Sequence, residues 1–380
     1  MKEKVTAYLS LGSNQGFRPH ILQQAILSLN KLAGKVTQIS GVYENASWGF
    51  DGDDFLNLCV AVETDLRPDL LLECLLSIEQ QSGRQRYADE NYRSRSLDID
   101  IIYYGDAIID ADSLTVPHPK MHERRFVLKP LADIAPQFYH PLLKKDTRNL
   151  LQECKDKSVM QKKGRLFKNR EGLFSQLHFL AIEGNIGVGK TTLTKEIAKD
   201  FNAKLVLERF ADNPFLPKFY EDQARYAFPL EMSFLADRYQ QFTDDTSQFD
   251  LFKTFMVSDY DIYKSLIFAN VTLQKVEFDL YRKLFNFMYK EVKKPDIYVY
   301  LYQSTERLLE NIKKRGRDYE QQIKADYLEK INRGYLDFIK GHPDQNSTII
   351  NLKELDFVAN ISDYEIVLGA IGKKILERIF

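Results

Sequence analysis

Hydrophobic positions in the first 150 residues recur with the periods of short strands and of two long helices. Apolar runs and alternation predict strands at residues 5–11, 36–43 and 55–63, and apolar spacings of three and four predict helices at residues 21–32 and 68–81. Strands and helices in this order favour an α+β sandwich.

The second half of the chain places longer helical patterns between short apolar strands. This alternation predicts a doubly wound parallel sheet with helices on both faces, so the chain as a whole belongs to the α/β class. The predicted strands are 179–182, 204–207, 255–259, 296–301 and 347–352, and the predicted helices are 192–201, 226–242, 307–317 and one at the C-terminus.

Length and charge limit the organisation and the partners. A chain of 380 residues is too long for one ordinary core and indicates two domains. We expect these at residues 1–155 and 177–380, with a basic linker at 156–176. A formal net charge of -1 argues against nucleic acid as a partner, because nucleic-acid binders usually carry a basic excess.

The sequence also suggests a compartment. No apolar run reaches membrane-spanning length and the N-terminus shows no signal-like segment, so we expect no membrane partner and a cytoplasmic location. Cys59, Cys74 and Cys154 lack the spacing of metal ligands and are expected to be reduced thiols.

A glycine-rich turn between the strand at 179–182 and the helix behind it has the spacing G-x-x-x-x-G-K-T. Glycines let backbone N–H groups point at phosphate oxygens, and the helix N-terminus adds a favourable dipole. Lys190 is expected to reach the β- and γ-phosphates of ATP, and the Thr191 hydroxyl to ligate Mg²⁺. The alternative is a turn that binds no nucleotide. The predicted ATP-binding residues are Gly184, Asn185, Ile186, Gly187, Val188, Gly189, Lys190, Thr191 and Thr192.

Two carboxylates and an arginine cluster stand out in the first half. On a strand at 97–102, Asp98 and Asp100 share one face about 7 Å apart and form an anchor for cations that prefer oxygen ligands. Four arginines between Arg84 and Arg95 suit the charge of a polyphosphate. The alternative for the two carboxylates is a polar sheet face.

Several motifs make residues 1–155 resemble the 6-hydroxymethyl-7,8-dihydropterin pyrophosphokinase family. The motifs are Leu11-Gly12-Ser13-Asn14, Phe55-Leu56-Asn57, Glu79 to Arg86, Arg95 to Asp100, Val116-Pro117-His118-Pro119 and Arg124 to Leu131. The resemblance implies a ferredoxin-like sandwich that transfers a pyrophosphoryl group from ATP to a dihydropterin alcohol and releases AMP. It further implies that Asp98 and Asp100 hold two Mg²⁺ ions.

The same resemblance implies roles for the other motif residues. Phe55 and Phe126 are expected to sandwich the pterin ring, while Asn57 reads its hydrogen-bonding edge. Gly12 and Asn14 complete the expected substrate site. The nucleotide and its phosphates are expected to lie against Glu79, Arg84, Arg86, Arg95, His118 and Arg124, of which Arg84 and Arg95 act on the transferred group.

Two positions depart from this family's pattern. Tyr92 stands where many relatives have a tryptophan, and Ser113 stands where some have an arginine. For His118 the alternative to a phosphate contact is a turn histidine after Pro117.

The second half, from about residue 177 to about residue 365, resembles the deoxynucleoside kinase family and more closely its bacterial purine members. The resemblance implies transfer of the γ-phosphoryl group of ATP to a sugar 5′-hydroxyl, with Glu208 as general base. Tyr220 and Glu320 are expected to hold the 3′-hydroxyl, and Glu231 and Arg238 to face the base.

A basic helix end completes this predicted site. Arg315 and Arg317 are expected to belong to a lid over the phosphates, the alternative being a solvated helix end. The family also implies a homodimer through the kinase domain.

Two further positions depart from the kinase pattern. Tyr260, in Asp259-Tyr260-Asp261, stands where many members have an arginine that contacts the reacting end. Glu231 replaces a glutamine, and an ionised carboxylate only accepts hydrogen bonds, which by itself favours guanine. The runs around residues 213–215 and 235–239 look most like deoxyadenosine kinases, so deoxyadenosine is the expected first substrate.

We therefore expect a bifunctional enzyme that uses MgATP at two sites and acts on small molecules. Three alternatives stay open: one active half with a binding or scaffold module, a C-terminal nucleoside monophosphate kinase, and a nucleotide sensor without turnover. The oligomeric state, the preferred phosphate donor and any communication between the sites are left open by the sequence.

Overall fold

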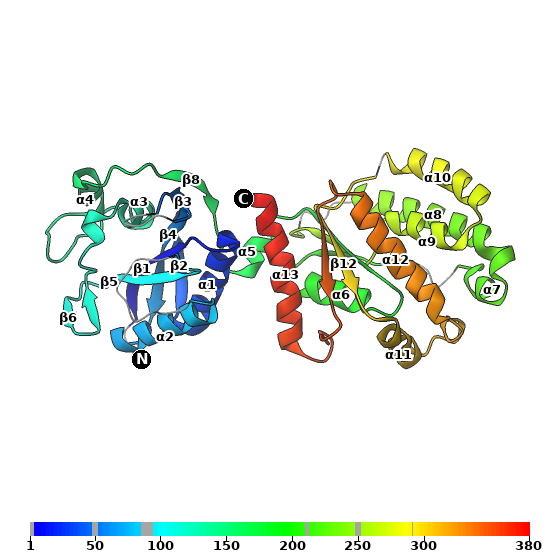
Figure 1. Cartoon of the computed structure of the whole chain (residues 1–380), viewed down its shortest axis with the longest axis horizontal. Helices are drawn as coiled ribbons and strands as arrows, with labels where there is room; N and C mark the ends of the chain where they lie inside the picture. Colours follow the sequence, from blue (N-terminus) through cyan, green and yellow to red (C-terminus); the bar gives the residue numbers. More distant parts are fainter. Residues whose placement is uncertain (1–3, 48–51, 85–93, 210–212, 248–251, 291) are drawn as a thin grey trace. The chain divides into compact units, whose positions relative to one another are not determined.

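The computed structural model describes residues 4–47, 52–84, 94–209, 213–247, 252–290 and 292–380 (Figure 1). The chain forms two compact units, Met1–Leu173 with Ile379–Phe380, and Phe174–Arg378. Each unit has its own sheet and its own core. In the described ranges no helix is both long and apolar enough to cross a membrane, and Cys59, Cys74 and Cys154 are free thiols.

The first unit is built on a six-stranded antiparallel sheet in the order β5-β1-β4-β3-β8, with β2 also paired to β4. Its two central strands, β1 and β4, are long and almost wholly buried, so they form the middle of the core of this unit. The strands are β1 (Val5–Ser13), β2 (Lys35–Ile39), β3 (Gly41–Asn45), β4 (Phe55–Thr64), β5 (Asp98–Tyr104) and β8 (Gln161–Arg165).

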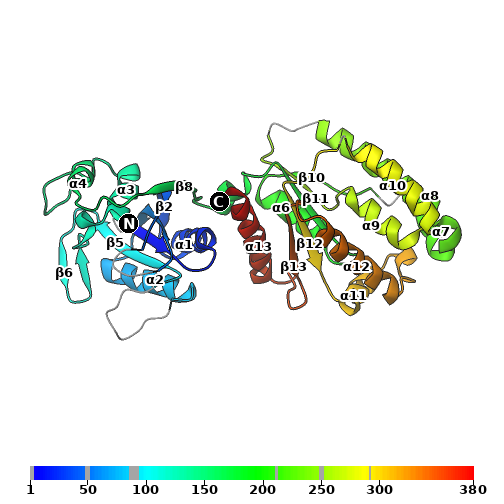
Figure 2. The same ribbon diagram turned by 45° about the horizontal axis from the view of Figure 1, so that its top comes forward.

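Helices cover both faces of this sheet (Figure 2). α1 (Arg18–Leu32) and α2 (Pro68–Gln81) lie on one face, where Leu22, Ile26 and Leu29 of α1 are buried. α3 (Arg125–Ile134) packs on the other face. Smaller elements are the hairpin β6 (Ile109–Ala111) and β7 (Leu114–Val116), η1 (Met121–Glu123) and α4 (Thr147–Glu153). This arrangement confirms the predicted α+β sandwich.

One predicted strand is in fact two strands. Residues 36–43 were predicted as a single strand, but the chain makes two strands, β2 and β3, with Ser40 between them. The Ser40 hydroxyl accepts the Cys59 N–H at 2.9 Å, and the Ser40 N–H donates to the Cys59 carbonyl at 3.0 Å. A side-chain oxygen thus takes the place of a backbone acceptor, so the ladder continues on β4 although the strand is interrupted.

The stretch expected as a basic linker contains regular structure. β8 (Gln161–Arg165) pairs antiparallel with β3, and α5 (Arg170–Phe174) follows it. Lys163 forms an ion pair with Glu44 at 2.6 Å. β8 is a mostly exposed edge strand, so its sequence lacks the apolar alternation that marks a half-buried strand.

The second unit contains a five-stranded parallel sheet in the order β10-β11-β9-β12-β13. All residues of the central strand β9 are buried, which is why its sequence is apolar from residue 179 to residue 182, before the buried Glu183. The strands are β9 (Phe179–Gly184), β10 (Lys204–Val206), β11 (Met256–Ser258), β12 (Ile297–Tyr302) and β13 (Ser347–Asn351).

Helices lie on both sides of the parallel sheet, as predicted for a doubly wound fold (Figures 1 and 2). α6 and α13 lie on one side, and α8, α9 and α12 on the other. The helices are α6 (Lys190–Asp200), α7 (Leu216–Glu221), α8 (Gln223–Ser247), α9 (Tyr263–Thr272), α10 (Lys275–Tyr289), α11 (Thr305–Arg315), α12 (Ala325–Gly341) and α13 (Ile361–Ile379), with η2 at Asp318–Glu320. α9, α10 and α12 were not predicted.

Candidate active sites

The first unit has a pocket of about 520 Å³ above β1, β4 and β5. Eight of its lining residues are predicted site residues, which come from segments far apart in the sequence. They are Gly12, Phe55, Asn57, Arg95, Asp98, Asp100, Arg124 and Phe126. Ser10 and Asn45 also line it and were not predicted.

The two aspartates of β5 differ in how they are paired. Asp98 accepts from Arg84 at 2.6 Å and from Arg95 at 3.0 Å. Asp100 has weaker contacts, because Arg124 and the His118 ring are each 4.0 Å from its Oδ2 atom. Burial and the neighbouring Asp98 carboxylate raise the pKa of Asp100 to about 7. A bound cation would favour the ionised form of both acids.

Glu79 does not line this pocket. Its side chain is buried on α2, where Oε1 accepts the Ile99 N–H at 2.8 Å and also a short contact from Arg84. Arg84 therefore bridges Glu79 and Asp98, and Glu79 acts as an anchor for the arginine.

His118 makes the contact expected of a turn histidine, and its ring also faces Asp100. Its Nδ1 atom accepts the Lys120 N–H at 3.2 Å, as in a turn histidine. This contact leaves the proton of the neutral ring on Nε2, which faces Asp100. Burial and the nearby Arg124 charge lower the pKa of His118 to about 4, so the ring is a neutral donor.

Asn57 is fixed by a residue that sequence reasoning missed. Its Nδ2 atom donates to Asn45 Oδ1 at 2.7 Å, across the β3–β4 pairing. Its Oδ1 atom would lie 2.9 Å from a Cβ placed on Gly12, so a larger residue at position 12 would require the Asn57 side chain to shift. Phe55 and Phe126 each lie near an arginine, Arg95 at 5.9 Å and Arg124 at 5.7 Å from the ring centroid.

Two other positions, Asn14 and Ser113, do not line the pocket. Asn14 is buried and uses its amide on the neighbouring loop, accepting the Arg95 N–H at 2.7 Å and donating to Ser94 and to the Asp53 carbonyl. Ser113 is exposed in the turn between β6 and β7. Arg86 and Tyr92 lie outside the described residues.

The second unit places the glycine-rich turn between β9 and α6, as predicted. Gly184, Gly187 and Gly189 have φ values of 153°, 83° and 98°, which side chains with a Cβ rarely adopt. Lys190 Nζ donates to the carbonyls of Gly184 at 2.8 Å and Asn185 at 3.0 Å. Burial and the charge of Lys264 lower the pKa of Lys190 to about 8.

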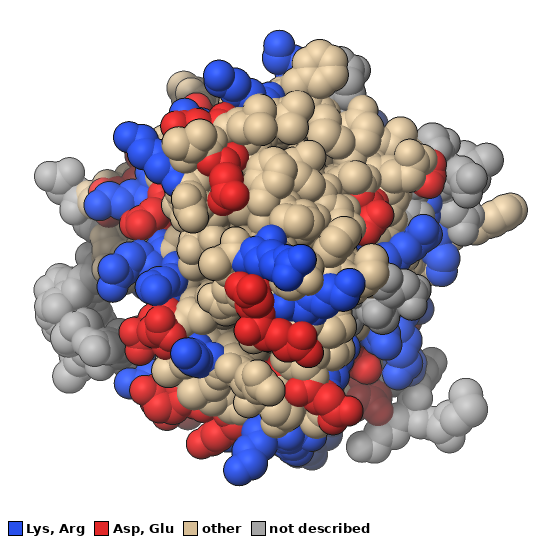
Figure 3. Space-filling view, turned by 90° about the vertical axis from the view of Figure 1, so that its right-hand side faces the viewer, with Lys and Arg blue, Asp and Glu red and all other residues tan. Residues whose placement is uncertain are grey.

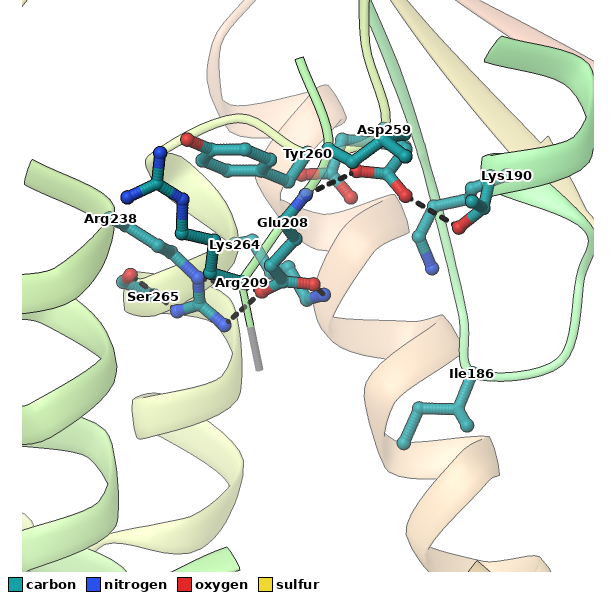
Figure 4. Close-up of polar contacts among 12 residues, drawn as sticks. Ile186, Lys190, Glu208, Arg209, Arg238, Asp259, Tyr260, Lys264 and Ser265 are labelled. Carbon is teal, nitrogen blue, oxygen red and sulfur yellow. Dashed lines mark hydrogen bonds and ion pairs between the residues drawn. The ribbon is translucent and has the colours of Figure 1, made fainter. Parts of the chain in front are cut away.

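Asp259 at the end of β11 connects the turn to Glu208 (Figure 4). Its Oδ2 atom accepts the Thr191 hydroxyl at 2.5 Å, and its Oδ1 atom accepts the Glu208 N–H at 2.8 Å. The sequence showed an acidic strand end here, but gave no role to it. In the described ranges no three His, Cys, Asp or Glu side chains form a metal site.

Glu208 lies between two cations in Figure 4. Arg238 donates to its Oε1 atom through Nε at 2.8 Å and Nη2 at 2.7 Å. Lys264, which was not predicted, lies 2.5 Å from its Oε2 atom. Burial raises the pKa of Glu208, but Lys264 and Arg238 outweigh that effect and bring it to about 2.

Arg238 was expected to face the base, but it is held at the reacting end. Besides Glu208 it donates to Ser265 Oγ at 2.6 Å, and its guanidinium lies 4.7 Å from the Phe234 ring centroid. It lies two turns after Glu231 on α8, so the two residues share a face of the helix. Tertiary contacts then give them different partners.

Glu231 lies deep in the second pocket. Its Oε1 atom accepts the Thr272 hydroxyl at 3.1 Å. Its Oε2 atom is buried and has no hydrogen-bond partner within the part of the chain that the structure describes. Burial, partly offset by Arg238, raises the pKa of Glu231 to about 7. Phe234 and Phe268 also line this pocket.

The basic helix end turns back on the same pocket. Arg315 and Arg317 both pair with Glu320, the latter at 3.2 Å. Tyr319 stacks on Tyr220 with ring centroids 6.3 Å apart.

Together these residues enclose about 810 Å³. The predicted residues that line the space are Ile186, Gly187, Lys190, Thr191, Glu208, Tyr220, Glu231, Arg238, Arg315, Arg317 and Glu320. Gly184, Asn185, Val188, Gly189 and Thr192 belong to the turn but do not line it; Asn185 is buried and donates to the Leu328 carbonyl.

Two family models match separate parts of the chain: "Deoxynucleoside kinase" over residues 180–377 and "7,8-dihydro-6-hydroxymethylpterin-pyrophosphokinase" over residues 8–136. A deoxyguanosine kinase of Bacillus subtilis is 36% identical over 202 residues, which is 52% of this chain and 98% of the relative. A deoxyadenosine/deoxycytidine kinase of the same organism is 32% identical, over 52% of this chain and 92% of the relative. A 2-amino-4-hydroxy-6-hydroxymethyldihydropteridine pyrophosphokinase of Synechocystis is 40% identical, over 39% of this chain and 75% of the relative.

Proposed function

Because the chain belongs to both the deoxynucleoside kinase and the 7,8-dihydro-6-hydroxymethylpterin-pyrophosphokinase families, we propose how its own residues perform the two reactions. The chain is a bifunctional transferase. One half transfers a pyrophosphoryl group from ATP to the dihydropterin alcohol and releases AMP, and the other transfers the γ-phosphoryl group of ATP to a deoxynucleoside 5′-hydroxyl.

In the first unit we assign the pterin to the space between Phe55 and Phe126. Asn57 presents one amide edge there, oriented by Asn45. Arg95 and Arg124 flank the aromatic pair and carry the charge that the transferred phosphates need. Asn14 acts by positioning the backbone of Arg95.

Asp98 and Asp100 are assigned to Mg²⁺. Two neighbouring carboxylates with unequal pairing fit a cation that takes one or two carboxylates plus phosphate oxygens. When bound, the ions neutralise charge on the phosphoryl group during in-line attack. Arg84 holds Asp98 in place, and Glu79 holds Arg84. Removal of Mg²⁺ is expected to stop both reactions.

In the second unit we assign the phosphates to the turn before α6, with Lys190 as their cation and Thr191 as a Mg²⁺ ligand. Glu208 takes the proton of the attacking 5′-hydroxyl. Tyr220 and Glu320 are assigned to the 3′-hydroxyl, and Arg315 and Arg317, now paired with Glu320, to the phosphates as a lid.

We propose that Glu231 contacts the nucleobase of the deoxynucleoside and thereby determines which nucleobase is preferred. The buried, unpartnered Oε2 atom needs a donor, and the adjacent Oε1 atom has room for one besides Thr272. Guanine presents two neighbouring N–H donors on its Watson–Crick edge. We therefore propose deoxyguanosine as the preferred acceptor, ahead of the deoxyadenosine expected from the sequence runs.

Deoxyadenosine is the second candidate, and the raised pKa of Glu231 favours it. A protonated carboxyl donates once and accepts once, which matches the adenine edge. Turnover of the intact chain with each deoxynucleoside and MgATP tests the order. A higher kcat/KM for deoxyguanosine supports the proposal, and a higher value for deoxyadenosine or for a pyrimidine deoxynucleoside would overturn it.

We propose a homodimer through α10. Four apolar side chains repeat along one face of this helix and are exposed: Val276 at 82%, Leu280 at 51%, Leu284 at 38% and Phe287 at 78%. Figure 3 shows the end of the chain that carries α7, α8 and α10, where a broad area is free of charged side chains. An exposed apolar face of this kind is best covered by a second copy of the chain.

Light scattering of the intact protein tests the dimer. Val276→Glu with Phe287→Glu is expected to give a monomer, while Arg282→Ala on another face of α10 leaves the dimer intact. A wild-type monomer at micromolar concentration would refute it.

A further inference from the structure

Lys264 is a buried cation with an acidic partner at the reacting end of the kinase site. It lies in the first turn of α9, where the helix dipole disfavours a positive charge. Its Nζ atom is 2.5 Å from Glu208 Oε2, and the two side chains are 9% and 8% exposed. A lysine this buried is retained only with a charge partner.

Both oxygens of Glu208 are occupied, by different cations. Arg238 takes Oε1 with two donors and is itself fixed by Ser265. Lys264 takes Oε2 with a single flexible ammonium group. A hydroxyl that gives its proton to Glu208 is best accommodated at Oε2, which accepts from one flexible ammonium group, because Oε1 already accepts from two donors of Arg238.

Tyr260, which stands where many family members have an arginine, does not reach the Glu208 carboxylate. Tyr260 is fully buried and packs its ring against Phe242, with centroids 6.4 Å apart. In Figure 4 its ring points away from the Glu208 carboxylate, while Lys264 reaches it. Lys264 lines the pocket and Tyr260 does not.

We propose that Lys264 is the positioning residue that supplies the positive charge missing at Tyr260, holding Glu208 ionised until the acceptor binds. The inference rests on the proposed role of Glu208 as base. The 5′-hydroxyl then donates to Oε2 beside the ammonium. Its oxygen bonds to the γ-phosphorus, the bond from that phosphorus to the β-phosphate oxygen breaks, ADP leaves, and the proton goes to Glu208.

Lys264→Met keeps the length of the side chain and removes the charge, and Arg238 still pairs with Glu208. We expect kcat for deoxynucleoside phosphorylation to fall about a hundredfold with KM for the nucleoside nearly unchanged. Lys264→Arg should retain activity within about tenfold. The matched control is Lys199→Met, because Lys199 is an exposed lysine on α6. The pterin reaction, measured on each variant, serves as an internal control for folding.

A double-mutant cycle separates the inference from its premise. Glu208→Gln should abolish phosphorylation, and adding Lys264→Met to it should cost nothing more. If Glu208→Gln stays active, the role of Glu208 fails. If Glu208→Gln is inactive while Lys264→Met has wild-type kcat, or if the losses multiply, the role of Lys264 fails. If Lys264→Met does not fold, a hundredfold loss in a folded Lys264→Arg would also overturn it.

Discussion

The two active sites treat their acidic residues in opposite ways. In the pterin site Asp98 is paired with arginines, whereas among the described residues the charged partners of Asp100 lie 4.0 Å away, and its pKa is raised. In the kinase site Glu208 forms ion pairs with Arg238 and Lys264, and these cations lower its pKa to about 2. Asp100 is therefore suited to accept a cation, whereas the two cations beside Glu208 keep that carboxylate unprotonated until the acceptor hydroxyl binds.

The kinase site repeats the contrast within itself. Glu231 lies on the same helix as Arg238, yet one of its oxygens has no hydrogen-bond partner among the described residues. The partner of this oxygen is expected to be the nucleobase of the substrate. Glu208 would then take part in the phosphoryl transfer, while Glu231 would recognise the nucleobase.

The largest expected effect separates the two sites. Asp98→Asn with Asp100→Asn should reduce AMP formation from the pterin reaction about a thousandfold by removing the Mg²⁺ anchor, and leave deoxynucleoside phosphorylation unchanged. Lys190→Ala should do the reverse. Both products are measured on each variant, and loss of both activities in either would contradict two separate sites.

A smaller effect is expected at the base-reading carboxylate. Glu231→Gln adds a donor and should move the ratio of kcat/KM for deoxyadenosine over deoxyguanosine upward by about 10- to 100-fold. Thr272→Val, which removes only the partner of Oε1, should change the ratio much less. An unchanged ratio in Glu231→Gln would show that another group reads the base.

The raised pKa of Glu231 predicts a pH dependence. The group faces Arg238, Thr272, Lys264 and Glu208, and burial is the largest influence on it. Below about pH 7 its carboxyl is protonated and suits adenine, and above it the carboxylate suits guanine. The deoxyadenosine to deoxyguanosine ratio should therefore rise by up to about 100-fold from about pH 8 to about pH 6. Glu231→Gln should abolish the trend.

The smallest effect concerns the pterin pocket. A Cβ at Gly12 would lie 2.9 Å from Asn57 Oδ1, so Gly12→Ala should displace that amide. We expect KM for the dihydropterin to rise roughly fivefold, equivalent to about 1 kcal/mol. The kinase reaction of the same protein should not change, and an unaltered KM would mean that Asn57 has room to move.

Local spacing made much of both sites predictable. The phosphate-binding turn needs glycines at fixed intervals, and Asp98 and Asp100 share a strand face by alternation, so neighbours in sequence determine each. The long buried strands and the helix at Pro68–Gln81 were predictable for the same reason.

Residues defined by tertiary contacts were not predictable. Asn45 and Ser10 reach the pterin pocket from neighbouring strands, and Asp259 and Lys264 reach Glu208 from β11 and α9. None of them stands at a spacing that signals chemistry. Arg238 shows the same limit, because helical periodicity placed it on the face of Glu231 but could not tell which acid it would bind.

The most direct test of two separate sites is simultaneous turnover by the intact chain. With MgATP, the dihydropterin alcohol and deoxyguanosine present together at saturation, AMP and ADP should form at the rates measured with each acceptor alone. Loss of either product when both acceptors are present, or turnover of only one acceptor under any condition, would contradict the account.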